Sequence, residues 1–253
     1  MRHHLLNDAR LELEHLARLA ERHPGELIEQ NDGGIAEVAS AGDARVSALP
    51  PAEIVRTIDS NGLWMVLKNI ERDPEYKRLL DVLLDEVAPI VASNEGGMMQ
   101  REGFIFLSAP HATTPSHTDP EHNFLLQIRG VKEMVVGEFP DRRTRQLEIE
   151  NQSSGGHRNV DWTPVRPQTF RLEPGDGVYV PPHAPHLVRN GSQPSISLSI
   201  TFRTPLTERT ARASSVNARL RRLHLDPKAP GERPRVDRAK AGASRALGRF
   251  RRR

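Results

Sequence analysis

The spacing of hydrophobic residues changes at Gly96-Gly97, and the change divides the chain into a helical first part and a strand-rich middle. In the first part, apolar side chains recur three and four positions apart, which is the period of an amphipathic helix. The two stripes are Leu6, Ala9, Leu13, Leu16, Ala17 and Ala20, and Tyr76, Leu79, Leu80, Leu83, Leu84, Val87 and Val91. We expect one helix before His23 and another beginning at Asp73-Pro74, because Asp is a favoured N-cap and Pro suits the first helical turn.

Beyond Gly97 the apolar residues form short runs separated by turn residues, which is typical of β-sheet proteins. We expect strands at 104–108, 123–128, 131–136, 177–181 and 195–202, and a buried strand within 63–70. Arg129-Gly130 has the length of a two-residue hairpin turn. Many short strands of this kind indicate a sandwich or barrel. We expect the polar residues 139–168 to form a long insertion loop.

The chain therefore divides into three sections: a helical or mixed section at 1–97, a barrel at 98–203 and an extension at 204–253. The extension holds 15 Lys or Arg and 4 Asp or Glu residues, a net charge of +11, so the rest of the chain carries −8 within the total of +3. We expect a helix at about 206–225, followed by a flexible tail. A second subunit can pack on this helix to form a homodimer, and a basic tail can attract nucleic acid.

Composition excludes several classes of function. The 253 residues include no cysteine, so disulfides, cysteine-ligated metal clusters and thiol catalysis are excluded. The sequence holds no apolar run of the roughly 18 residues that a membrane span needs, and the N-terminal stretch is too charged for a secretory signal. We expect a cytoplasmic protein that does not enter the membrane.

The strongest candidate for chemistry is His117-Thr118-Asp119. Two residues separated by one position on a strand point to the same face, so this His and Asp can hold one metal ion. A third ligand must come from elsewhere. His186 is the candidate, since it follows a turn and a short strand that ends in Pro181-Pro182. His183 is the alternative, and His111 and His122 are expected to be exposed.

Two His and one carboxylate on one side of a metal leave its other coordination positions open, as in non-haem Fe(II) oxygenases. Zinc enzymes use similar ligand sets, so the ligands alone do not identify the metal.

The spacing of these residues resembles the two cupin motifs. Gly175, Pro181, His186 and Asn190 match the second motif throughout, and His117, Asp119, Asn123 and Gly130 match the spacing of the first. Asp119 replaces the second His of that motif and Asn123 replaces its Glu. With these replacements the motif resembles that of the JmjC-type oxygenases. Residues 114–136 also resemble the corresponding stretch of a small JmjC hydroxylase, the asparaginyl hydroxylase that acts on hypoxia-inducible factor; their sequence is TPSHTDPEHNFLLQIRGVKEMVV. The wider chain also resembles small bacterial cupin-like proteins.

The resemblance implies a mainly β fold: a double-stranded β-helix, or jelly-roll barrel, with N-terminal helices and a basic helical C-terminal extension. It also implies an Fe(II)- and 2-oxoglutarate-dependent dioxygenase that hydroxylates an unknown protein, peptide or small molecule. Thr114 and Lys132 match the family's residues for the distal carboxylate of 2-oxoglutarate. Asn123 is a candidate for orienting a ligand, and Thr201 stands where the family has an Asn beside the cosubstrate.

Lys132 has a rationale of its own, because a buried ammonium among apolar residues needs an anionic partner. Two alternatives stay open. One is a cupin that binds Fe, Mn, Ni or Zn without 2-oxoglutarate. The other is a ligand- or metal-sensing cupin that binds nucleic acid through its basic tail.

Overall fold

The computed structural model describes residues 1–39 and 47–250. The strands in this part of the chain are β1 (Ile28–Asp32), β2 (Leu63–Lys68), β3 (Met99–Ser108), β4 (Thr113–His117), β5 (His122–Arg129), β6 (Lys132–Glu138), β7 (Val165–Leu172), β8 (Gly177–Val180), β9 (His186–Asn190) and β10 (Ser195–Arg203). The α-helices are α1 (Leu13–Arg22), α2 (Pro51–Arg56), α3 (Pro74–Asp85), α4 (Ala88–Glu95), α5 (Arg142–Gln152), α6 (Pro205–Arg222) and α7 (Pro234–Phe250).

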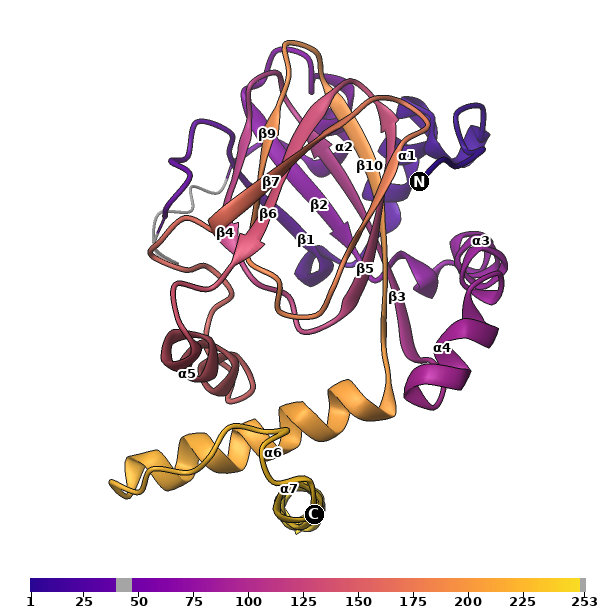
Figure 1. The fold of residues 1–253 in the computed structure, drawn as a ribbon. Helices are drawn as coiled ribbons and strands as arrows, with labels where there is room; N and C mark the ends of the chain where they lie inside the picture. The colour runs from indigo at the N-terminus through magenta and orange to yellow at the C-terminus, as the bar shows by residue number, and fades with distance from the viewer. Residues whose placement is uncertain (40–46, 251–253) are drawn as a thin grey trace.

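The described strands form two antiparallel sheets that face each other as a jelly-roll barrel (Figure 1). The larger sheet has the order β1-β2-β3-β10-β5-β8, and the smaller has the order β4-β9-β6-β7. Strands that are neighbours in one sheet are far apart in sequence, as where β3 pairs with β10. The mainly β, jelly-roll fold expected from the sequence is confirmed.

Strand β10 separates two environments because its side chains alternate between the faces of the large sheet. Ile196, Leu198, Ile200 and Phe202 join the main hydrophobic core on the outer face, where α1, α2 and α3 pack. The intervening Ser195, Ser197, Ser199 and Thr201 are also buried, and they face the interior of the barrel. A second, smaller core between the sheets includes Leu125, Met134 and Val188. The polar lining leaves the interior able to hold a hydrophilic molecule.

The N-terminal section supplies both helices and strands. Its strands β1 and β2 extend the large sheet beyond β3, and its helices cover the outer face of that sheet (Figure 1). The helix expected at Asp73 is confirmed, with the Asp73 side chain accepting from the Glu75 backbone N–H. The first helix begins at Leu13, later than its apolar stripe indicates, after a short 3-10 turn at Ala9–Leu11.

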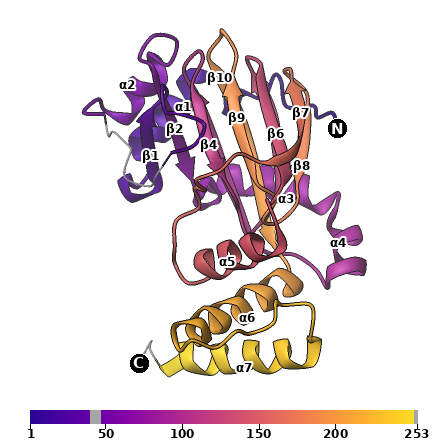
Figure 2. The same cartoon turned by 60° about the vertical axis from the view of Figure 1, so that its left-hand side comes forward.

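Two expectations about irregular segments differ from the structure. The segment 139–168 contains helix α5, which Asp141 caps by accepting from the backbone N–H of Arg143 and Thr144, so it is not simply a loop. The second half of the C-terminal extension forms α7 where a flexible tail was expected. Helices α5, α6 and α7 stack beneath the barrel (Figure 2).

The stacking explains why a segment with so few apolar residues is helical. Arg221 of α6 forms an ion pair with the buried Glu150 of α5, and Lys240 of α7 donates to Asn217 of α6. Polar contacts between the helices thus compensate for the small apolar surface of the extension. The section boundaries at 97 and 203, the homodimer and the binding of nucleic acid stay predictions.

No helix in residues 1–39 and 47–250 is both long and apolar enough to cross a membrane.

The packing of α3 on the large sheet generates a stability prediction. We expect Leu80→Ala to lower the free energy of unfolding by about 2–5 kcal/mol, because Leu80 is 1% exposed and its removal leaves a cavity. Val82→Ala on the exposed face of the same helix should change it by less than about 0.5 kcal/mol. Urea denaturation measures both, and equal losses would contradict the described orientation of α3.

Candidate metal centre

The pairing of β4 with β9 places the two candidate histidines opposite each other. His117 and His186 are Cα partners in this antiparallel pair, and their ring centroids are 4.1 Å apart. Asp119 lies in the loop, two residues beyond the end of β4, so the expectation that both ligands stand on one strand is wrong. Its Oδ2 is 3.8 Å from Nε2 of His117 and 3.7 Å from Nε2 of His186. The three residues predicted from the sequence therefore converge, with one potential ligand atom from each lying within 4.8 Å of the others.

Backbone carbonyls set the orientation of both imidazole rings. Nδ1 of His117 lies 2.7 Å from the Pro115 carbonyl oxygen, and Nδ1 of His186 lies 2.8 Å from that of Ala184. Because a carbonyl only accepts, each Nδ1 carries the proton, and in a neutral ring Nε2 keeps its lone pair. Both lone pairs are then directed toward Asp119. Such outer hydrogen bonds orient histidine ligands in metal sites, so the donor set fits a divalent transition metal.

Asp119 is held as a carboxylate. Burial alone raises the pKa of its carboxyl group, but His117, Arg158 and His186 outweigh this effect and lower the pKa to about 2. Arg158 Nη1 donates to Oδ1 at 2.9 Å, and Oδ2 is the oxygen that faces the histidines. This arrangement favours a single carboxylate oxygen as the metal ligand.

His186 is held in the neutral form that binds a metal. Burial, reinforced by the neighbouring His117, lowers the pKa of His186 to about 4. At neutral pH the ring therefore carries no positive charge, and no proton has to leave Nε2 when a cation arrives.

A strand irregularity and an inserted segment fix the shape of the site. The pairing of β4 with β9 shifts register between Thr114 and His117. His117 also forms an isolated β-bridge with Asn159, and the Thr118 backbone N–H donates to the Arg158 carbonyl at 3.1 Å. Residues just after α5 thus run beside the loop that carries Asp119 and restrict its movement.

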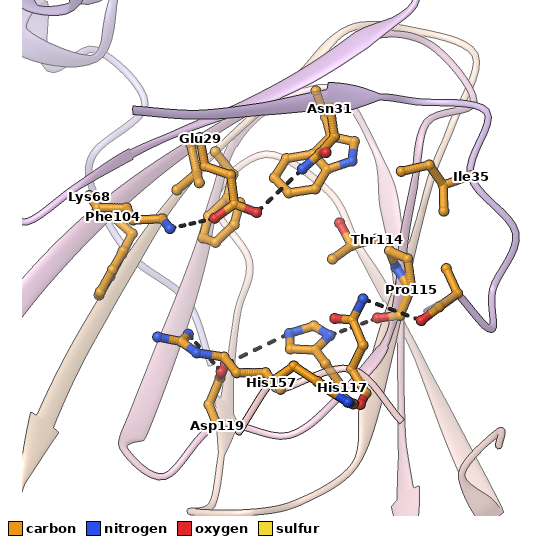
Figure 3. Close-up of a pocket in the computed structure, with 16 residues that line it drawn as sticks. Glu29, Asn31, Ile35, Lys68, Phe104, Thr114, Pro115, His117, Asp119 and His157 are labelled. Carbon is orange, nitrogen blue, oxygen red and sulfur yellow. Dashed lines mark hydrogen bonds and ion pairs between the residues drawn. The ribbon is translucent and has the colours of Figure 1, made fainter. Parts of the chain in front are cut away.

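A cavity of about 340 Å³ opens beside the metal ligands. Its floor includes His117, Asp119, His157, Arg158 and Asn159. Figure 3 shows Glu29, Asn31 and Lys68 on the opposite side of the cavity, with Thr114 and Pro115 at one edge. The remaining wall is largely apolar and is made of Ile35, Ala39, Trp64, Val66, Phe104 and Phe106.

Lys132 is buried in β6, at 3% exposure. Alternate residues share a face, so it points the same way as Met134, which belongs to the core between the sheets. Within residues 1–39 and 47–250 no acidic side chain forms an ion pair with Lys132, and burial lowers its pKa to about 7. The buried amine therefore lacks the anionic partner that would stabilise its charge.

The other predicted cosubstrate residues lie on β4 of the smaller sheet and on β5 and β10 of the larger sheet. Thr114 lines the cavity with His117 and Asp119. Asn123 of β5 pairs with Thr201 of β10, and both are buried. Asn123 accepts a hydrogen bond from the Ser199 hydroxyl at 2.8 Å. Asn123 therefore contacts the polar interior of the barrel, and among the described residues its side chain forms no hydrogen bond with His117, Asp119 or His186.

The alternative histidines have other contacts. Nδ1 of His183 lies 3.0 Å from Oε1 of Gln152. The backbone N–H of His183 donates to the Asp119 carbonyl, so His183 stabilises the loop that carries Asp119. His111 is exposed as expected. The expectation that His122 is exposed is wrong: it is 5% exposed, hydrogen-bonds to Tyr179 and stacks on Phe202.

Sequence reasoning missed Arg158 and the cavity wall formed by β1 and β2. Arg158 lies in a polar segment without a recognisable motif, and Asn31 and Trp64 come from a section expected only to pack on the barrel. The one available signal for β2 is its buried apolar run, which indicates a strand but not the neighbour of that strand.

Arg158 generates a prediction about metal affinity. We expect Arg158→Gln to weaken Zn²⁺ or Co²⁺ binding about 10- to 100-fold, because a ligating carboxylate loses its orienting partner. Arg166→Gln is the matched control, since Arg166 is exposed and pairs with Glu138. Calorimetric titration measures both, and equal affinities for the two variants would show that Arg158 does not orient Asp119.

Comparison with known proteins places the chain in a domain family. The JmjC domain matches residues 77–210, slightly more than half of the chain. A Drosophila melanogaster protein, Jumonji C domain-containing protein 5, is 28% identical over 105 residues, covering 37% of this chain and 26% of the relative.

The fold is also similar to that of a solved structure, the Escherichia coli ribosomal oxygenase YcfD in complex with cobalt and 2-oxoglutarate. The TM-score is 0.53 at 20% identity, covering 90% of this chain and 54% of the other. This chain thus spans about a quarter of the Drosophila relative and about half of the Escherichia coli protein. The extent of the domain match shows that the chain belongs to the JmjC domain family.

Proposed function

We propose that this protein is an Fe(II)- and 2-oxoglutarate-dependent dioxygenase that hydroxylates a substrate held in the cavity beside His117 and Asp119. The observation that carries the proposal is the combination of the His117–Asp119–His186 group with Lys132, which is buried and forms no ion pair within residues 1–39 and 47–250. The three ligands would bind one side of a metal ion. The Lys132 ammonium needs an anion inside the same barrel.

His117, Asp119 and His186 would hold the metal and leave its other coordination positions free. Bound Fe(II), together with 2-oxoglutarate and dioxygen, supplies the oxidising chemistry that places oxygen in a C–H bond. The cobalt and 2-oxoglutarate in the Escherichia coli complex are consistent with this pair of ligands. A neutral His186 and an ionised Asp119 accept a divalent cation without first losing a proton.

Lys132 and Thr114 would bind the distal carboxylate of 2-oxoglutarate. A carboxylate beside Lys132 restores the ammonium charge that burial disfavours, and the ion pair is strong because the site is shielded from water. The Thr114 hydroxyl can add a hydrogen bond at the edge of the cavity. These two residues would bind and orient the cosubstrate.

The apolar walls of the cavity would exclude water from the reacting centre. Phe104 and Phe106 of β3 and Val66 of β2 line it, and these side chains have no hydrogen-bonding groups. A dry cavity strengthens the charge interactions within it and protects a reactive centre from solvent.

Turnover of 2-oxoglutarate tests the function without knowledge of the substrate. We expect wild-type protein with Fe(II), ascorbate and 2-oxoglutarate to release succinate slowly, and His117→Ala to reduce the rate by about 100-fold or more, since a lost ligand weakens metal binding at least as much as a lost outer partner. His4→Ala is the matched control, because His4 is exposed and far from the site in the sequence. Anaerobic binding of 2-oxoglutarate is measured in the same samples. A protein that binds metal but neither binds nor converts 2-oxoglutarate would favour a cupin of another chemistry.

The pKa of Lys132, lowered to about 7 by burial, predicts the pH dependence of cosubstrate binding. A carboxylate bound beside the amine raises this pKa, so binding above pH 7 requires uptake of a proton. We expect the affinity for 2-oxoglutarate to be nearly constant below about pH 6 and to fall by up to about tenfold per pH unit above 7. Lys132→Met should bind more weakly and lose this slope, as anaerobic calorimetry can show. A slope that persists in Lys132→Met would assign it to another group.

A further inference from the structure

The cavity wall opposite the metal ligands contains a pair of buried polar side chains that the proposed chemistry does not use. Asn31 of β1 and Trp64 of β2 are Cα partners in the antiparallel pair. They are 5% and 7% exposed, and both line the cavity. Side chains that are directly opposite in such a pair are neighbours, so Asn31 and Trp64 occupy adjacent positions on the cavity wall.

One polar atom of each side chain has no hydrogen-bond partner in the part of the chain that the structure describes. Nδ2 of Asn31 lies 3.3 Å from Glu29 Oε1, and because a carboxylate only accepts, the amide nitrogen is the group that faces Glu29. Oδ1 of Asn31 is then a free acceptor. Neither it nor the Trp64 Nε1–H donor has a partner within residues 1–39 and 47–250. A buried polar group without a hydrogen-bond partner destabilises the protein, so a ligand that hydrogen-bonds to both atoms removes that cost.

The charged groups around the cavity are already paired with one another. Glu29 forms an ion pair with Lys68, and Arg158 forms one with Asp119. Neither a phosphate nor a cationic side chain would therefore find an uncompensated charge in this wall. The two unpaired atoms select a neutral group that offers an acceptor to Trp64 and a donor to Asn31.

We infer that Asn31 and Trp64 form a substrate-recognition subsite for a neutral carboxamide, such as the side chain of a Gln or Asn residue in a peptide. The carboxamide oxygen accepts from Trp64 Nε1, and its NH₂ group donates to Asn31 Oδ1. Figure 3 places Asn31 across the cavity from His117 and Asp119, so a carboxamide held there directs the adjoining carbon atoms toward the metal ligands. The hydroxylation of these carbons rests on the proposed function, whereas binding of the carboxamide by Asn31 and Trp64 does not depend on it.

The indole N–H resonance of Trp64 reports on the subsite directly. The chain has two tryptophans, Trp64 and Trp162, so a ¹⁵N-labelled sample gives two indole signals, and Trp64→Phe assigns them by loss of one. The full-length protein is titrated with N-acetyl-glutamine amide, N-acetyl-glutamate amide and N-acetyl-norleucine amide. These probes share their backbone amides and differ only in the side chain. Free glutamine tests whether a small molecule serves as well as a peptide.

We expect the glutamine probe to shift the Trp64 indole signal while leaving that of Trp162 in place, and the glutamate and norleucine probes to leave both unchanged. Asn31→Leu should reduce the affinity for the glutamine probe about tenfold while the indole signal remains. Equal shifts with the norleucine probe would assign the subsite to a backbone amide and overturn the inference. So would the absence of any shift, or a shift caused by 2-oxoglutarate alone.

The titration is run with and without Zn²⁺ and 2-oxoglutarate, which separates this inference from the proposed function. If the protein does not bind 2-oxoglutarate, the dioxygenase assignment is contradicted, but the response of the Trp64 indole signal to the glutamine probe still tests the subsite. Conversely, if the wild type releases succinate but the Trp64 signal shows no carboxamide-specific shift, the dioxygenase assignment is supported and the proposed subsite is contradicted. In the active enzyme, a glutamine or asparagine peptide should raise succinate release several-fold. Trp64→Phe should abolish this increase, and Trp162→Phe should retain it.

Discussion

The antiparallel pairing of β4 with β9 is the constraint on which the site depends. It places His117 directly across from His186, and the backbone carbonyls of Pro115 and Ala184 then rotate both rings to the same side. The Asp119 carboxylate completes the group from the loop that follows. A one-residue slip in this pairing would turn His186 away from His117, since alternate strand residues point to opposite faces.

The inserted segment after β6 also restricts the position of the loop that carries Asp119. Its helix α5 carries Gln152, which donates to the Thr118 carbonyl and hydrogen-bonds to His183. Arg158 farther along the segment holds Asp119. The same helix packs on α6, where Glu150 pairs with Arg221. The C-terminal extension is thus connected to the ligand loop through a continuous series of polar contacts.

The barrel interior divides into parts with different chemistry. The face of β10 that lies inside the barrel contributes small hydroxyl side chains. Strand β6 of the opposite sheet contributes Lys132, which forms no ion pair with an acidic residue in the described part of the chain. The wall formed by β1 and β2 combines the Glu29–Lys68 ion pair with Oδ1 of Asn31 and Nε1 of Trp64, which have no partner among the described residues. Cosubstrate and substrate would therefore meet different surfaces, one suited to a carboxylate and the other to a neutral polar group.

The sequence by itself determined the fold class and the three candidate ligands. Strand periodicity and turn residues are local properties, and the spacing of His117 with Asp119 keeps these two ligands close along the chain, although Asp119 lies in the loop after β4. It also indicated Lys132, because an isolated cation in an apolar strand is anomalous wherever the strand lies. Tertiary structure alone decided the rest. Arg158 acquires its role through contact with a carboxylate 39 positions away, and Asn31 and Trp64 become one subsite only when β1 pairs with β2. The helicity of α7 likewise depends on packing against α6, since its own residues offer too little apolar surface to compensate for the entropy of ordering.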